Sequence, residues 1–173
     1  MANTAIGEME GVREGQQYAT FTLNEEEYAI DAVNVQEIIE LTNVTKVPHL
    51  PEYLKGVINL RGTIIPVIDM KMKLGMKAEG AGKHTCVIVT EFSGGVMGLI
   101  VDLVSDVLHI PAEAVSPAPA FGAKIRTDFI KGMGKMGDRL VLMLDIDKVL
   151  TEEETEAIKE AAARPLEAET VNT

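Results

Sequence analysis

The sequence predicts a mainly β protein made of two small barrels related by internal duplication. Residues 55–69 and residues 131–145 share one plan: each opens with Lys-Gly, turns at a Gly-containing corner, continues as an apolar arm and ends in Asp. Short apolar runs around such a corner are typical of β-hairpins. A shift of 69 residues also places the pattern of residues 17–38 on that of residues 86–107. Four or five short strands per copy favour a small barrel, because closure removes exposed strand edges.

The first copy begins at Gln17, where polar and apolar residues alternate up to Leu23 with the period of a strand. The elements expected after it are short and separated by polar or proline-containing turns: a strand at 28–30, a strand or one helical turn at 33–39, a strand at 44–47, the hairpin 55–69 and a helix at 70–74. Asp69 is the expected cap of that helix. Pro66 stands within a hairpin arm and predicts a sheet edge or a bulge.

The second copy follows a Gly-containing linker at residues 75–83. Its expected elements repeat the order of the first copy: strands at 86–92 and 96–101, a short motif at 104–107 and the hairpin 131–145. The offset between the copies grows from 69 to 76 residues after the motif. We expect the additional residues in the Pro- and Ala-rich loop 111–123.

The chain is expected to have three parts: a flexible tail at 1–16, a folded part at 17–150, and a C-terminal helix and tail at 151–173. Within the folded part we expect one subdomain at about 17–74 and a second at about 84–150, packed intimately. Thr151 and Glu154 form a capping box that opens the C-terminal helix. Two barrels side by side leave a groove between them, which is the natural place for a binding surface.

The net charge of −11 and the residue types argue against several classes of protein. Most of the acidity lies in residues 1–16 and 145–173, and there is no basic stripe, so binding to phosphate backbones is not expected. No uncharged apolar run approaches the ~18 residues of a membrane helix. The first residues lack the pattern of a secretory signal. The one cysteine, Cys86, cannot form an internal disulfide and fits a reducing cytosol as a buried, inert thiol.

The sequence shows no catalytic or metal-binding pattern. His49, His84 and His109 each lack a Cys, His or carboxylate at metal-ligand spacing. Asp69 and Asp145 recur at the same position of the two copies, which indicates a shared role as helix caps rather than a carboxylate pair. We therefore expect neither an enzyme nor a bound cofactor.

One position breaks the repeat: Arg61 lies at the first hairpin corner, whereas its counterpart in the second copy is Gly137. The hairpin therefore does not need an arginine to form. A guanidinium group carries five donors in a rigid fork, which suits a carboxylate or the backbone carbonyls of a partner. The alternative is a solvated turn charge or an internal bridge to a glutamate.

Residues 35–38 and residues 104–107 are equivalent in the two copies, and each motif combines aliphatic side chains with one acid, Glu37 or Asp106. Plain core packing with a solvated acid is one explanation. If the two copies face each other across the groove, the same residues form its apolar walls.

These motifs together resemble those of CheW, a family of bacterial chemotaxis coupling proteins. The similarity runs from about Gln17 to Leu150, and the Asn-Leu-Arg-Gly corner is its most specific part. It rests on a set of motifs in a fixed order: Tyr28-Ala29-Ile30-Asp31, Val35-Gln36-Glu37-Ile38, KGVINLRG at 55–62, IIPVID at 64–69, Val101-Asp102 with Val104-Ser105-Asp106-Val107, and Gly137-Asp138-Arg139.

The resemblance implies two five-stranded SH3-like β-barrels and a non-enzymatic adaptor. Such an adaptor joins the cytoplasmic tip of membrane chemoreceptors to the regulatory domain of the histidine kinase CheA. It is cytoplasmic and is recruited to receptor arrays at the inner face of the cell membrane. The resemblance also implies that a helical receptor hairpin lays an apolar face in the groove between the barrels.

Carried over to this sequence, the receptor-binding positions lie in or beside that groove: Val35, Gly56, Arg61, Cys86, Val87, Gly98, Val104 and Val107. The kinase-binding positions implied in the same way are Ala32 and Glu37. Ala32 is smaller than the aliphatic residue that is common there, and Cys86 stands where Val is usual.

A small-barrel module that binds nucleic acid or another ligand is the alternative. An OB-like nucleic-acid binder needs surface aromatic residues and a basic groove. Three Tyr, four Phe and the excess of acids do not favour it. A hydrolase with an Asp/His pair requires distant residues to converge, and no spacing indicates such a pair.

Overall fold

The computed structural model describes residues 17–41, 43–46, 51–77, 82–92, 95–117 and 129–163. The strands in these ranges are β1 (Gln17–Leu23), β2 (Glu26–Asp31), β3 (Val35–Glu40), β4 (Leu54–Leu60), β5 (Thr63–Asp69), β6 (Cys86–Phe92), β7 (Gly95–Val101), β8 (Leu103–His109), β9 (Val115–Ser116), β10 (Ile130–Met136) and β11 (Arg139–Leu144). The helices are the 3-10 turns η1 (Ala32–Asn34), η2 (Ala112–Ala114) and η3 (Ile146–Lys148), and the α-helices α2 (Met70–Lys73) and α3 (Glu152–Ala163). The expectation of a mainly β protein is confirmed.

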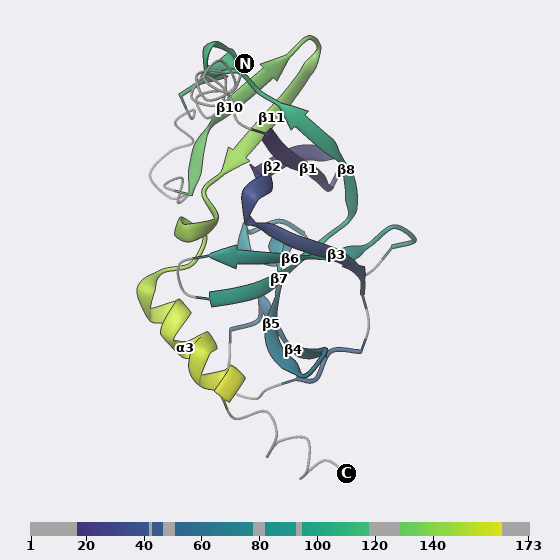
Figure 1. The fold of residues 1–173 in the computed structure, drawn as a ribbon, viewed down its shortest axis with the longest axis vertical. Helices are drawn as coiled ribbons and strands as arrows, with labels where there is room; N and C mark the ends of the chain where they lie inside the picture. Colours follow the sequence, from purple (N-terminus) through teal and green to yellow (C-terminus); the bar gives the residue numbers. More distant parts are fainter. Residues whose placement is uncertain are drawn as a thin grey trace, which may run out of the picture.

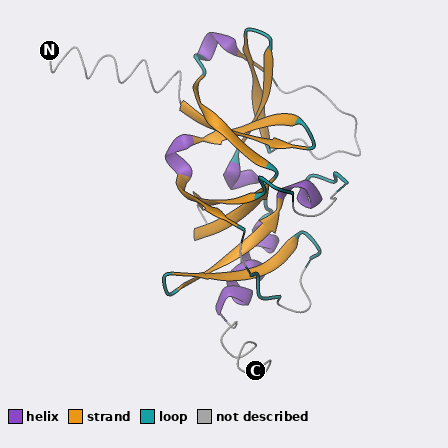
Figure 2. Ribbon diagram, turned by 90° about the vertical axis from the view of Figure 1, so that its right-hand side faces the viewer, coloured by secondary structure: helices purple, strands orange, loops and turns teal. Residues whose placement is uncertain are grey.

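The strands form two sheets that lie one above the other along the long axis of the molecule (Figures 1 and 2). Sheet A has the order β8-β1-β2-β11-β10-β9, and sheet B has the order β3-β6-β7-β5-β4. Helix α3 lies beside sheet B (Figure 1). In the described ranges, no helix is long and apolar enough to span a membrane.

Each sheet takes strands from both halves of the chain. The β1–β2 hairpin lies in sheet A between β8 and β11, and the β6–β7 hairpin lies in sheet B between β3 and β5. The parallel pairs β2–β11 and β5–β7 join each hairpin to the strands of the other half. The linker at 75–83 therefore separates the two sequence repeats, but strand pairing crosses the expected subdomain boundary.

The pairing registers show that the two copies exchange hairpins in the same way. Val35 of β3 pairs with Thr90 of β6, and the counterpart Val104 of β8 pairs with Phe21 of β1. Both ladders carry a β-bulge next to this pair. The same 69-residue shift relates the two pairs, as duplication of one unit predicts.

The two later hairpins end in the same kind of cap. Asp69 accepts a hydrogen bond from the Met72 main-chain N–H at 3.2 Å, and Asp145 accepts one from the Asp147 N–H at 3.1 Å. The expected capping role of both acids is confirmed. Each cap lets the chain turn from the end of a strand into a short helix, α2 or η3.

Helix α3 begins with the expected capping box and is attached to sheet B through the same glutamate. The Glu154 N–H donates to Thr151 Oγ1 at 3.1 Å, and the Thr151 N–H donates to Glu154 Oε1 at 2.8 Å. Glu154 also accepts hydrogen bonds from the Tyr53 hydroxyl at 2.6 Å and from Lys73 Nζ at 2.9 Å. Burial raises the pKa of Glu154, but these donors more than offset it and lower the pKa to about 2.

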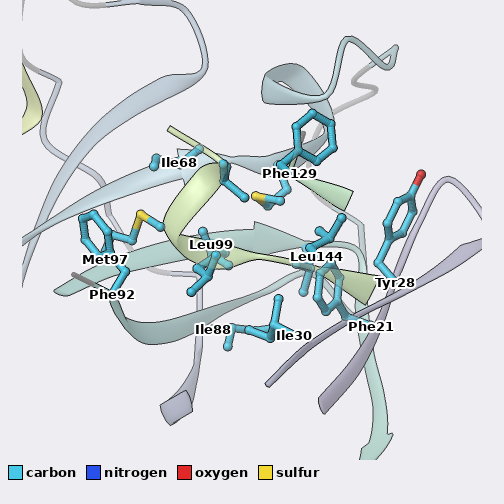
Figure 3. Close-up of a cluster of buried hydrophobic side chains, with 14 of the residues drawn as sticks. Phe21, Tyr28, Ile30, Ile68, Ile88, Phe92, Met97, Leu99, Phe129 and Leu144 are labelled. Carbon is cyan, nitrogen blue, oxygen red and sulfur yellow. The ribbon is translucent and has the colours of Figure 1, made fainter. Parts of the chain in front are cut away.

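The largest core cluster lies between the two sheets (Figure 3). Phe21 and Leu144 of sheet A are packed together with Ile88 and Leu99 of sheet B. Smaller clusters pack separately among the strands of sheet A and of sheet B. The space between the barrels is therefore filled, and an expected groove can lie only at the margin of this shared core.

Two segments of the first half differ from the expectation. Residues 33–39 contain both alternatives, because η1 ends at Asn34 and β3 begins directly after it. In place of a strand at 44–47, the described part of that segment forms a single bridge between Thr45 and Val57.

The sheet edge that Pro66 predicts is not found, but the β4–β5 ladder carries a β-bulge opposite Val67 and Ile68, directly after the proline. Pro66 lies in β5, which has neighbours on both sides in sheet B. Pairing with β7 begins only at Val67, so the proline stands just before that ladder. A proline at this place leaves the β5–β7 hydrogen bonds intact.

Some expectations concern parts of the chain outside the described residues: the tail at 1–16, His49, the linker at 78–81, the turn at 93–94, the loop beyond residue 117 and the segment 164–173.

Candidate functional site

The edge strands β3 and β8 occupy equivalent positions in the two sheets. Tyr18 pairs with Asp31, which places the start of β3, reached through η1, near the start of β1. Gln17, the first residue of β1, pairs with His109, the last residue of β8. The start of β3 therefore lies near the end of β8.

The same argument holds at the other end of the two strands. Val101 pairs with Cys86, which places the start of β8 near the start of β6. Cys86 also pairs with Glu40, the last residue of β3. The start of β8 therefore lies near the end of β3.

Aliphatic side chains are exposed on both edge strands. Ile38 is 47 % exposed, and its counterpart Val107 is 58 % exposed. Val35 and Val104 are partly buried and pack against the shared core. We call these four side chains, Val35, Ile38, Val104 and Val107, the β3–β8 surface. Ile38 was not among the expected binding residues, although the 69-residue shift maps it onto Val107.

Cys86 lies beside this surface, at the start of β6. Its side chain is partly buried against the shared core. Burial raises the pKa of the thiol, and a hydrogen bond with the Val104 main chain acts in the opposite direction. The thiol is therefore protonated at neutral pH and unreactive, and it connects β6 with β8.

Three of the expected receptor-binding residues lie inside sheet B. Val87 is fully buried. A Cβ atom at Gly98 would stand 2.7 Å from Val87 Cγ1. Gly56 has a φ of +147°, and a Cβ atom there would stand 2.1 Å from the Thr45 carbonyl oxygen. The two glycines allow close packing within sheet B, and none of the three residues presents a side chain at the surface.

Arg61 lies at the β4–β5 corner with a φ of +51°, and its side chain is 70 % exposed. It forms an ion pair with Glu37 of β3, and the hydrogen bond and charge of Glu37 raise the pKa of the guanidinium. Arg61 is thus not sealed in the core, and the internal bridge to a glutamate is present. The pair connects β3 with the β4–β5 hairpin across sheet B.

A second arginine holds the other edge strand. Arg139, at the start of β11, binds Glu27 of β2 at 2.6 Å and Asp106 of β8 at 3.2 Å. The Asp106 N–H donates to the hydroxyl of the buried Thr20 at 3.1 Å. Hydrogen bonds from Arg139 and Thr20 lower the pKa of Asp106. Comparison of equivalent positions missed this pair, because Arg139 stands two residues beyond Gly137, the counterpart of Arg61.

The expected kinase-binding residues lie at the start of β3. Ala32 belongs to η1 and is partly buried, whereas the neighbouring Val33 is 85 % exposed. Glu37 lies farther along, on β3, and is engaged by Arg61.

A polar cleft of about 450 Å³ opens between the β1–β2 turn, α2 and the β7–β8 junction. The buried Lys71 forms an ion pair with Asp102 at 2.8 Å, and Asp102 also accepts a hydrogen bond from the Asn24 N–H at 2.8 Å. These contacts fasten the β1–β2 hairpin to α2. Among the residues that the structure describes, no group of three or more His, Cys, Asp and Glu side chains is arranged to hold a metal ion.

Two interlocked β-barrels with a shared core, ion-paired edge strands and an exposed aliphatic surface define a small β scaffold. Comparison with known proteins identifies its family. The sequence model of the CheW-like domain matches residues 17–154. The chain belongs to this family of chemotaxis scaffold proteins, which are adaptors and not enzymes.

Individual relatives support the assignment. The chemotaxis protein CheW of Klebsiella aerogenes is 40 % identical over 157 residues, which cover 91 % of this chain and 95 % of that protein. CheW of Helicobacter pylori is 33 % identical over 147 residues, which cover 85 % of this chain and 88 % of that protein. The crystal structure of the scaffolding protein TtCheW from Thermoanaerobacter tengcongensis matches with a TM-score of 0.74 at 34 % identity, covering 81 % of this chain and 95 % of that chain. The resemblance seen in the sequence motifs is confirmed.

Proposed function

We propose that this scaffold couples membrane chemoreceptors to the histidine kinase CheA, in the cytoplasm and within receptor arrays at the inner face of the cell membrane. The β3–β8 surface receives the apolar face of a helical receptor segment. The proposal depends above all on the exposure of Ile38 and Val107, which occupy equivalent positions on the edge strands of the two sheets. Exposed aliphatic side chains are a feature of protein-binding surfaces when they lie close together.

The residues implied by the family divide into two roles in this proposal. Val35, Val104 and Val107 contact the receptor directly, because their side chains reach the surface. Cys86 and Val87 lie on β6, which pairs with β3, and Gly56 and Gly98 allow close packing within sheet B, so these four residues support the surface from within. Arg61 remains exposed and uses donors that Glu37 does not engage to bind a carboxylate or a backbone carbonyl of the receptor.

The kinase contact is proposed at η1. Val33 adjoins Ala32 and is 85 % exposed. It supplies the aliphatic contact for which the Ala32 side chain is too short. Glu37 lies on β3 between Val35 and Ile38 of the β3–β8 surface, and we propose that it borders both the receptor contact and the kinase contact.

The individual contacts are expected to be weak. Each aliphatic side chain that becomes fully buried contributes about 1.5–3 kcal/mol, and the cost of association offsets much of this gain. Repeated contacts within an array would raise the overall affinity through effective concentration.

Co-sedimentation with purified receptor and kinase, scored also for kinase activation, tests the proposal. Val107→Lys places a charge on the β3–β8 surface and is expected to weaken receptor binding at least about tenfold, since the ammonium group would be desolvated in the complex. Leu140→Lys is the matched control. Leu140 is 54 % exposed on β11, which β1 and β2 separate from β8. Equal receptor binding by the wild type and Val107→Lys would contradict the proposal.

Val35→Lys tests the β3 side of the same surface. Loss of receptor binding with an unchanged circular dichroism spectrum is expected. An unfolded spectrum would show instead that Val35 belongs to the core.

A further inference from the structure

The backbone pairing of each edge strand of the β3–β8 surface is interrupted at one point. A β-bulge interrupts the pairing of β3 with β6 between Val35 and Glu37, and the equivalent bulge interrupts the pairing of β8 with β1 opposite Thr20. A bulge leaves a residue unpaired and disrupts the ladder locally. Side-chain contacts at this point therefore have a larger influence on where the strand lies.

An arginine from the neighbouring hairpin supplies such a contact on both strands. Arg61 binds Glu37 of β3, and Arg139 binds Asp106 of β8. Glu37 and Asp106 are equivalent under the 69-residue shift, so the two clamps hold the same point of the two copies.

The clamp on β8 has more contacts than the clamp on β3. Arg139 is bound by both carboxylate oxygens of Glu27, at 3.0 Å and 2.6 Å, which fix the guanidinium over β2. Arg139 then reaches both carboxylate oxygens of Asp106, at 3.3 Å and 3.2 Å. The Arg139 side chain is 36 % exposed, about half the 70 % exposure of Arg61.

We propose that Arg139 is a positioning residue of the β3–β8 surface, which acts through Asp106 to hold strand β8 in the position that binds the receptor. Val107 follows Asp106 directly in the chain and Val104 precedes it by two residues. The Arg139–Asp106 contact therefore fixes the position of both aliphatic side chains of β8. This inference rests on the proposed function.

The primary test compares Arg139→Gln with the wild type by calorimetric titration with a soluble receptor-tip fragment. We expect binding to weaken about fivefold, since a displaced β8 must be reordered on binding. Lys131→Gln is the matched control, because Lys131 also forms an ion pair in sheet A, with Asp31 of β2 at 2.9 Å. Unchanged affinity of Arg139→Gln would overturn the inference.

Two further measurements separate positioning from a general loss of stability. Hydrogen exchange at Ser105 to Leu108 is expected to accelerate in Arg139→Gln while exchange in β3 is unchanged. In double-mutant cycles with receptor binding as the readout, Arg139→Gln should be coupled to Val107→Ala and additive with Ile38→Ala. Equal coupling to both side chains, or equal acceleration of both strands, would overturn the inference.

Asp106→Asn serves if Arg139→Gln does not fold, because it weakens the same clamp with almost no change in volume. The same pattern is expected, and unchanged binding by Asp106→Asn would also overturn the inference. Failure of the wild type to bind the receptor fragment would contradict the proposed function instead. The exchange rates of β8 test the clamp without any receptor.

Discussion

The two copies of the duplicated unit share one backbone plan and differ in the side chains that stabilise it. Val35 and Val104 keep the same pairing register, the same neighbouring bulge and the same packing against the shared core. The acid that follows is bound by Arg61 in one copy, and in the other by Arg139, which stands two positions farther along the repeat. After duplication, the contact was kept while the position that supplies it changed.

Close packing around the glycines offers the largest contrast between the copies. Gly56 and Gly132 are equivalent, but only Gly56 has a φ in the left-handed region, at +147°. Gly56→Ala should destabilise the fold by about 3 kcal/mol or more, because strain and a clash with the Thr45 carbonyl add. Gly132→Ala should cost less, about 1–2 kcal/mol, because the nearest atom, Val115 Cγ1 at 2.8 Å, belongs to a side chain that can move, and the backbone contact, Ser116 O at 3.0 Å, is much longer than the one at Gly56. Urea unfolding followed by circular dichroism measures both, and equal costs would contradict this difference.

Replacing Thr20 by the residue type of its counterpart Val89, and the reverse, has the next largest expected effect on stability. Both side chains are fully buried, and only Thr20 has polar partners, on Asp106. Thr20→Val should cost about 1–2 kcal/mol, since the Asp106 N–H loses its acceptor. Val89→Thr should cost at least as much, about 1–3 kcal/mol, because it buries a hydroxyl without a prepared partner. A neutral Val89→Thr variant would show that sheet B can satisfy a hydroxyl at this position.

Helix α3 distinguishes the copies in a way that depends on pH. Tyr53 donates to Glu154, whereas the equivalent residue in the second copy is Phe129, which has no hydroxyl. The pKa of Glu154 is lowered to about 2, so its contribution to stability is complete above its ordinary pKa and is lost as the pH falls towards 2. Glu154→Gln should cost about 1 kcal/mol at pH 6, and the difference from the wild type should shrink between pH 5 and pH 2. A difference that stays constant over this range would contradict the assignment. Chemical denaturation at each pH provides the measurement.

The smallest effect on stability is expected for Arg61→Ala. The Arg61–Glu37 pair is exposed, and surface ion pairs contribute little to folding. We expect an unchanged unfolding midpoint and weaker receptor binding in a pull-down. A lower midpoint would show that the Arg61–Glu37 pair contributes to folding.

Much of the site could be anticipated from the sequence because its signals are local. The hairpins at 55–69 and 131–145, the caps Asp69 and Asp145 and the motif at 35–38 each follow from a turn, a period or a short spacing. The placement of Val87 inside sheet B could not be read from its apolar strand, since core and surface aliphatic residues look alike in such a run. Arg139 was hidden because a comparison of equivalent positions detects residues that stayed in place and misses contacts that moved.

The sequence by itself determined the duplicated unit, its hairpins and its helix caps, since turn chemistry and side-chain periodicity act over a few residues. Only the tertiary structure decided that the β1–β2 and β6–β7 hairpins lie among strands of the opposite half, and that β3 and β8 become edge strands of the two sheets. These hairpins are apolar on both faces. Placing them between strands of the other half buries one face in the smaller core cluster of that sheet and the other face in the shared core. The partner that completes such burial lies far away in the sequence, so no local pattern can specify it.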